Sequence, residues 1–137
     1  MAEKQKVEYS QIEAGYEFPA SSFQMDDPAV ATYLRAVGET GTLYNDSRLV
    51  PPTAIAAFAM AALSEKLSFP PGTIHVSQDL EFMDTISTSD TLTCYARVSR
   101  KQDRGKLHLL TVDLNVHNQQ KRTVLAGKTS FVLPEQG

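Results

Sequence analysis

The feature that most constrains this chain is a helix-forming segment, residues 51–63, that is apolar on nearly every side. Pro51, Pro52 and Thr53 open it, and the ten residues that follow carry no charge and include six alanines. A helix with so little polar surface cannot lie on the outside of a domain, so other parts of the chain must cover it. Only the β-rich C-terminal half is long enough, which predicts a helix wrapped by a curled antiparallel sheet.

Four segments after this helix alternate apolar and polar or β-branched residues, as strands do. They are residues 74–83, 91–99, 107–116 and 123–133. Turn formers at 103–106 and 117–120 join the last three into a meander. The aromatic segment 16–24, interrupted by a proline, predicts an edge strand, and a helix over 29–37 is expected behind the N-cap candidate Asp26. This order predicts an α+β fold with one sheet of about five strands.

The bulk properties predict a single domain over residues 1–137, with a polar lead-in at 1–9 and a frayed end at 134–137. A net charge of -3, with lysines and arginines scattered singly, gives no basic stripe, so nucleic acid is not an expected partner. The charged amino terminus lacks an apolar signal core, and the longest apolar run is too short to span a bilayer. We therefore expect a cytoplasmic protein that does not enter a membrane.

The chain has one cysteine, Cys94, so an intrachain disulfide is impossible. Cys94 shares a strand face with Leu92, Ala96 and Val98, which predicts a buried core thiol and not a nucleophile. No cysteine and histidine set has metal-ligand spacing, and no glycine-rich phosphate loop is present. The sequence therefore predicts no cofactor and no metal.

Three segments carry a resemblance to a known family. They read Leu-Val-Pro-Pro-Thr at 49–53, Gly-Thr-Ile-His-Val-Ser-Gln at 72–78, and Asp-Thr-Ile-Ser-Thr-Ser-Asp-Thr-Leu at 84–92. With the order of elements, they resemble the MaoC-like (R)-specific enoyl hydratase and dehydratase family, in particular its FAS1-type amino-terminal dehydratase domain. Thr85 and Ser89 replace the Pro and Gly of the family's turn.

The resemblance implies a hot-dog fold and a role in fatty acid metabolism. It implies a hydro-lyase, or a subunit of one, that reversibly hydrates 2-enoyl thioesters of coenzyme A or acyl carrier protein to 3-hydroxyacyl thioesters. It also implies a homodimer or a heterodimer with a second hot-dog chain, the two sharing a continuous sheet. The alanine-rich helix would leave room beside it for an acyl tail.

Catalytic members of the family carry a loop of the form Asp-x-Asn-Pro-x-His-x-Asp. The nearest match here, residues 43–48, has neither the Pro nor the His. This departure suggests that a partner chain supplies the acid and base. In the same loop Tyr44 and Asn45 are candidate substrate-binding residues and Asp46 a candidate catalytic residue, although Asn-Asp is also an ordinary turn pair.

Of the three histidines, His75 is the candidate catalytic residue, because it follows the end of the apolar helix where a hot-dog fold opens its acyl pocket. The alternative is a strand histidine bonded to the backbone. His108 and His117 are expected to be solvated. Gln78 is a candidate substrate-binding residue, but three residues from His75 it lies on the opposite strand face unless a bulge intervenes, and it is as well suited to capping the helix.

Pro52 and Thr53, at the start of the helix, are the remaining candidate substrate-binding residues. Glu65 leaves open a thioesterase that uses an acidic residue on this helix, although a solvated last turn explains it equally. Asp79 and Glu81 share a strand face, as at an exposed edge or dimer rim. A non-catalytic acyl-binding or assembly protein is the last alternative, because fold does not fix function.

Overall fold

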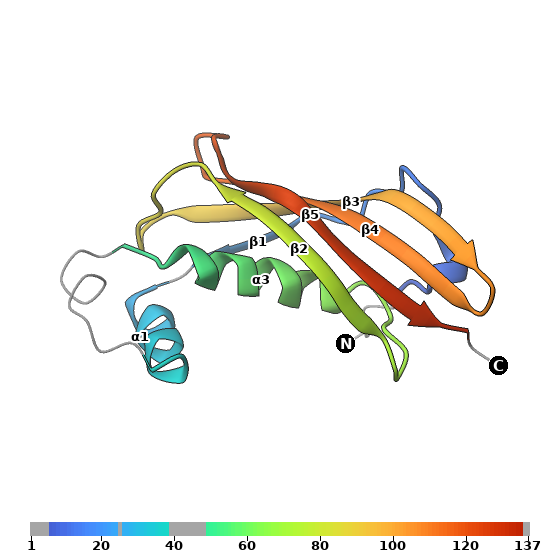
Figure 1. Ribbon diagram of the computed structural model, residues 1–137. Coiled ribbons are helices and arrows are strands. Elements are labelled where there is room, and N and C mark those ends of the chain that lie inside the picture. Colours follow the sequence, from blue (N-terminus) through green and yellow to red (C-terminus); the bar gives the residue numbers. More distant parts are fainter. Residues whose placement is uncertain (1–5, 25, 39–48, 136–137) are drawn as a thin grey trace, which may run out of the picture.

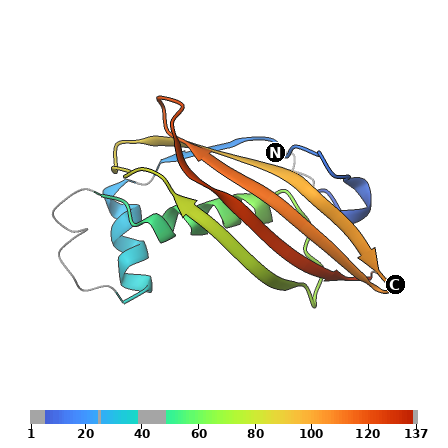
Figure 2. The ribbon, with the colours of Figure 1, turned by 45° about the horizontal axis from the view of Figure 1, so that its top comes forward.

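The computed structural model describes residues 6–24, 26–38 and 49–135 of the chain. These residues form one five-stranded sheet in which every neighbouring pair is antiparallel, in the order β1-β3-β4-β5-β2. The strands are β1 (Ser21–Gln24), β2 (Ile74–Phe82), β3 (Thr91–Arg104), β4 (Leu107–His117) and β5 (Thr123–Pro134). The sheet is long, twisted and curved (Figures 1 and 2).

The predicted strands and the meander of β3, β4 and β5 are confirmed, and β1 lies at an edge as expected. β3 is five residues longer than predicted, because a register shift between Val98 and Arg100 lets it continue to the turn before Leu107. Such bulges bend a strand and increase its twist. β5 accompanies the long β3–β4 hairpin as far as Leu107, which pairs with Pro134.

Two α-helices lie in the described part of the chain. α1 (Asp27–Ala36) starts at the predicted N-cap, where the Asp26 carboxylate accepts a 2.9 Å hydrogen bond from the backbone N–H of Ala29. α3 (Pro52–Ser64) starts as predicted. The sequence predicts that this helix continues to Leu67, before the prolines at 70 and 71, but it ends three residues earlier. α3 runs along one face of the sheet (Figure 1). α1 lies at the end of the sheet near the start of α3. We call the face that carries α3 the helix side.

The prediction that the sheet encloses the apolar helix is met on one side only. Ala54, Ile55, Ala59 and Leu63 are buried against the core, spaced so that they share one face of α3. Phe58 on the other face is 38% exposed. A single five-stranded sheet curves over one side of the helix and leaves the opposite side open.

Both ends of the described chain are more firmly anchored than the sequence predicted. The backbone of Val7 pairs with the segment after α3, donating to Lys66 and accepting from Ser68, both at 2.8 Å. At the other end Pro134 is the last residue of β5, and Glu135 donates a 3.0 Å bond to Lys106. Of the expected lead-in and frayed end, Val7, Pro134 and Glu135 thus contribute to the fold, while residues 1–5 and 136–137 lie outside the described residues.

Candidate functional site

β2 contains the bulge that His75 and Gln78 require in order to share a face. In the ladder with β5, His75 pairs with Phe131 and Ser77 with Ser130, so Val76 is an extra residue. Gln78 then pairs with Thr129. Paired residues project from the same side of a sheet, and Thr129 and Phe131 are both buried on the helix side. His75 and Gln78 therefore both project toward the helix side.

The bulge also corrects the predicted face assignment of β2. Strict alternation along the predicted strand 74–83 groups Ile74 with Leu80 and Phe82, but Ile74 pairs with Val132 and lies on the outer face. A one-residue shift of register reverses the face of every residue before it. Alternation read without the bulge therefore misplaces both Ile74 and His75.

The imidazole of His75 is held by two residues of β5. Its Nε2 lies 2.6 Å from the hydroxyl oxygen of Thr129, a fully buried residue. Its ring stacks on Phe131 with centroids 4.8 Å apart. His75 is thus bonded to a side chain and not to the backbone, and it remains exposed at the edge of the sheet.

β2 itself is an edge strand with unusually apolar exposed side chains. Ile74 is 60% and Val76 54% exposed, and Phe82 and the following Met83 are also exposed. Exposed edges of this kind are templates for pairing with another chain. Asp79 and Glu81 are exposed on the outer face of the same edge, as the sequence predicted.

The described residues do not bring all of the predicted site together. Pro52 and Thr53 lie at the start of α3. β2, whose second residue is His75, begins near the other end of that helix (Figure 1). Thr53 shares a 2.5 Å hydrogen bond with the hydroxyl of Tyr33 on α1. Tyr44, Asn45 and Asp46 lie outside the described residues.

The sequence missed a polar cluster on the β3–β4 hairpin. His108 Nδ1 and the hydroxyl of Tyr9 both lie 2.7 Å from Oδ1 of Asp103, and the rings of Tyr9 and His108 stack at 4.5 Å. The prediction that His108 is solvated is therefore wrong: its side chain is mostly buried beneath Tyr9. Asp103 and His108 flank the turn at Gly105 symmetrically, a signal that hairpin pairing could have revealed.

The cluster shifts the titration of two of its members. The hydrogen bonds from Tyr9 and then His108 lower the pKa of Asp103, because both stabilise the ionised carboxylate. Burial, followed by the hydrogen bond to Asp103, raises the pKa of Tyr9. Asp103 is therefore ionised and Tyr9 protonated near neutral pH.

Two further residues singled out from the sequence, Cys94 and Glu65, lie in the described part of the chain. Cys94 is 4% exposed, and burial raises the pKa of its thiol, in agreement with the predicted core role. Glu65 is exposed immediately after α3.

Among the described residues, no group of three or more histidine, cysteine or acidic side chains could hold a metal ion. None of the described helices is both long and apolar enough to cross a bilayer.

Comparison with known proteins adds to this geometry. Residues 13–126 match the family model described as the FAS1-like dehydratase domain region. No curated protein sequence matches the chain significantly.

The fold is shared with solved structures of low sequence identity. The R-hydratase PhaJ1 from Pseudomonas aeruginosa superposes with a TM-score of 0.81 at 20% identity, covering 97% of this chain and 89% of that one. A MaoC-like dehydratase from Rhodospirillum rubrum gives 0.75 at 14% identity, covering 93% and 97%. A chain of the ChsH1-ChsH2 complex from Mycobacterium tuberculosis gives 0.73 at 14% identity, covering 88% and 98%. The architecture is that of the hot-dog fold.

Proposed function

Because the chain belongs to the MaoC-like hot-dog dehydratase family, in its FAS1-like group, we propose that it binds acyl thioesters of coenzyme A or acyl carrier protein. The reaction it serves is the reversible hydration of a 2-enoyl to a 3-hydroxyacyl thioester. One observation carries the proposal: the bulge at Val76 directs both His75 and Gln78 to the helix side of an exposed edge strand.

This pair has the groups that thioester hydration needs. The reaction requires a base for water, an acid for the α-carbon and donors for the enolate-like oxygen. His75 is held through Nε2 by Thr129, so its Nδ1 is the ring nitrogen left to exchange a proton. The amide of Gln78 can donate to the thioester oxygen.

The start of α3 offers a second place for that oxygen. Its N-cap, Pro51, makes no side-chain cap, and Pro52 has no N–H. Backbone N–H groups at a helix start bind anionic oxygen well, because they lack helical partners and meet the positive end of the helix dipole. Thr53 stands at this end and is assigned to substrate binding.

A dimer would unite the two halves of this site. In one chain Thr53 lies in the first turn of α3, and β2, whose second residue is His75, begins near the other end of that helix. If the edges of two β2 strands pair antiparallel about a two-fold axis, the His75 end of one strand meets the Phe82 end of the other. The His75 of one chain then approaches the start of α3 in its partner.

The partner is either a second copy or a related hot-dog chain. The loop at 43–48 lacks the family's histidine, so a partner that carries the full acid and base loop would complete a hydratase. The ChsH1-ChsH2 complex, one chain of which shares this fold, supports a pairing of two different chains. A self-contained enzyme would instead use His75 with Asp46.

The test is hydration of crotonyl-CoA, followed by loss of the enoyl-thioester absorbance. The purified chain is compared with His75→Ala and with His117→Ala, which removes a histidine from the outer face. Turnover lost only in His75→Ala supports the self-contained enzyme. Turnover that appears only on mixing with a chain bearing the acid and base loop supports the partner-dependent subunit.

Two further readouts decide whether the proposal stands. Acyl-CoA should raise the melting temperature of the chain even where it is inactive alone. Release of free coenzyme A that is abolished in Glu65→Ala would establish a thioesterase instead. Absence of both acyl-CoA binding and turnover, alone and with such a partner, would exclude the proposed function.

A further inference from the structure

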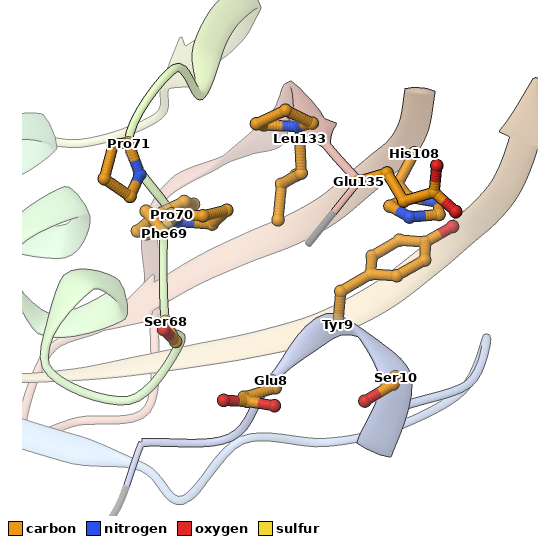
Figure 3. Close-up of a pocket in the computed structure, with 11 residues that line it drawn as sticks. Glu8, Tyr9, Ser10, Ser68, Phe69, Pro70, Pro71, His108, Leu133 and Glu135 are labelled. Atoms are coloured by element: carbon orange, nitrogen blue, oxygen red, sulfur yellow. The ribbon is translucent and has the colours of Figure 1, made fainter. Parts of the chain in front are cut away.

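A cavity of about 510 Å³ lies between the amino-terminal segment, the loop after α3, the start of β4 and the end of β5. This volume is typical of small-molecule sites. His75 does not line it. Figure 3 shows Phe69 and Pro70 on one side of the cavity and Tyr9 and His108 on the other, with Leu133 between them.

One wall of the cavity is apolar and held in place. Phe69, Pro70 and Pro71 form it, with Leu133 from β5. The ring of Phe69 packs on Phe131 with centroids 4.8 Å apart, which fixes its position. Prolines lose little conformational entropy on ordering, so this wall is preformed for an apolar group.

The opposite wall presents a hydrogen-bond acceptor. An ionised carboxylate can only accept, so the 2.7 Å contact between Asp103 and His108 assigns the proton to Nδ1. In the neutral ring Nε2 is then an acceptor, and it has no hydrogen bond within the part of the chain that the structure describes. The hydroxyl proton of Tyr9 is already donated to Asp103.

The charged groups that line the cavity are carboxylates. Glu8 and Glu135 come from opposite ends of the chain. The nearby cation of Lys101 is engaged elsewhere: it donates to the carbonyl of Ile12 at 2.8 Å and lies 4.4 Å from the centre of the Tyr9 ring. A ligand that enters therefore meets an apolar wall and groups that favour a positively charged donor.

We propose that this cavity is a binding site for an amphiphilic amine, a protonated amine that carries an apolar group. The apolar group packs on Phe69, Pro70 and Leu133. The ammonium group is attracted by the carboxylates of Glu8 and Glu135 and donates to His108 Nε2 when that ring is neutral. The site is separate from His75, so it does not depend on the proposed thioester function.

The test uses 2-phenylethylammonium as the probe, with neutral 2-phenylethanol and anionic 3-phenylpropionate as matched compounds. Binding is followed by amide chemical shifts of the labelled full chain. The amine should give saturating shifts at Tyr9, Ser68 and His108, and the other two compounds should bind more weakly. The double variant Glu8→Gln/Glu135→Gln should weaken amine binding about threefold to tenfold, as expected for two exposed charges.

The controls separate charge from folding. Glutamine at position 8 keeps an acceptor for the backbone N–H that Glu8 caps. Glu81→Gln removes a carboxylate from β2 and should leave amine binding unchanged. If the double variant does not fold, Glu135→Gln alone, beyond the last strand residue, gives the same comparison. Equal binding of amine and alcohol, wild-type affinity in the carboxylate variants, or no saturating shift through millimolar amine would overturn the proposal.

Discussion

His75 and Gln78, three residues apart in β2, project from the same face of the sheet. An unbroken strand would direct them to opposite faces. The extra residue Val76 removes this difference, because the partner strand advances by two residues, from Phe131 to Thr129, while β2 advances by three. A local irregularity in one ladder thus creates the candidate site.

The hydrogen bond between His75 and Thr129 can be tested with Thr129→Val. Valine keeps the shape and suits a buried strand position, but it cannot bond to the imidazole. Because His75 can turn to solvent, we expect a loss of about 1 kcal/mol or less in the free energy of unfolding. The ¹⁵N resonance of His75 Nε2 should move clearly.

The exposed Thr91→Val serves as the control and should leave the His75 resonance in place. An unchanged His75 resonance in Thr129→Val would show that the two side chains are not bonded in solution.

At Gly127 of β5 the backbone of β2 leaves no room for a side chain. A Cβ atom built there would lie 2.1 Å from the carbonyl oxygen of Asp79 and 2.8 Å from Leu80. Gly127→Ala therefore forces the edge strand away, and we expect a loss of about 1–3 kcal/mol or more, measured by urea unfolding. Gly105→Asn is the control, since no atom lies within 4 Å of that position and asparagine tolerates its positive φ. Equal stability of the two variants would contradict the close packing.

The Asp103 cluster predicts a pH dependence of stability. The pKa of Asp103 is lowered in the folded chain by the hydrogen bonds from Tyr9 and His108. The stabilisation is therefore present above the unfolded pKa, about 3.9, and is lost as the pH falls through the lower folded value. The difference in melting temperature between the wild type and Asp103→Asn should shrink below about pH 4.

Tyr9→Phe provides the internal check on that result. It removes the largest cause of the shift, so the carboxyl pKa of Asp103, followed by ¹³C NMR, should rise toward its ordinary value. A melting-temperature difference that stays constant through the acid range would contradict the assignment.

Cys94 should be unreactive in the folded chain. Its thiol is buried and its pKa is raised, so little thiolate is present and reagent cannot reach it. The rate of reaction with a disulfide reagent should follow unfolding and become fast in denaturant. Rapid modification of the native chain would show that the β3 core opens locally.

The sequence predicted the strands and turns well because their signals are local. Alternating side chains and turn formers depend only on neighbouring residues. The bulge at Val76 could not be predicted in the same way, since a register shift is set by pairing with β5, whose residues lie far along the chain. The same limit applies to His108. The sequence predicted a solvated side chain there, because Tyr9, which covers His108, lies far away in the sequence.

The apolar helix illustrates a different limit. Its composition showed that something covers it, but not whether the cover comes from the same chain. The sheet buries Ala54, Ile55 and Leu63, while Phe58 stays partly exposed. Exposed apolar groups on α3 and β2 of the same chain favour an interface with a second chain.

This interface gives the last prediction. Val76 is 54% exposed on an edge strand whose backbone can pair with another chain. A lysine there opposes pairing, because two-fold symmetry would bring its charge and that of the partner's copy toward the same interface and bury both. Val76→Lys should therefore reduce the association of the chain, measured as mass by light scattering over a range of concentrations, and leave the monomer folded. Leu107→Lys is the control, because Leu107 is half-exposed at the start of β4, which is not an edge strand. This variant should associate like the wild type. If both variants associate equally, β2 is not the contact, and the meeting of His75 with the partner's helix start fails with it.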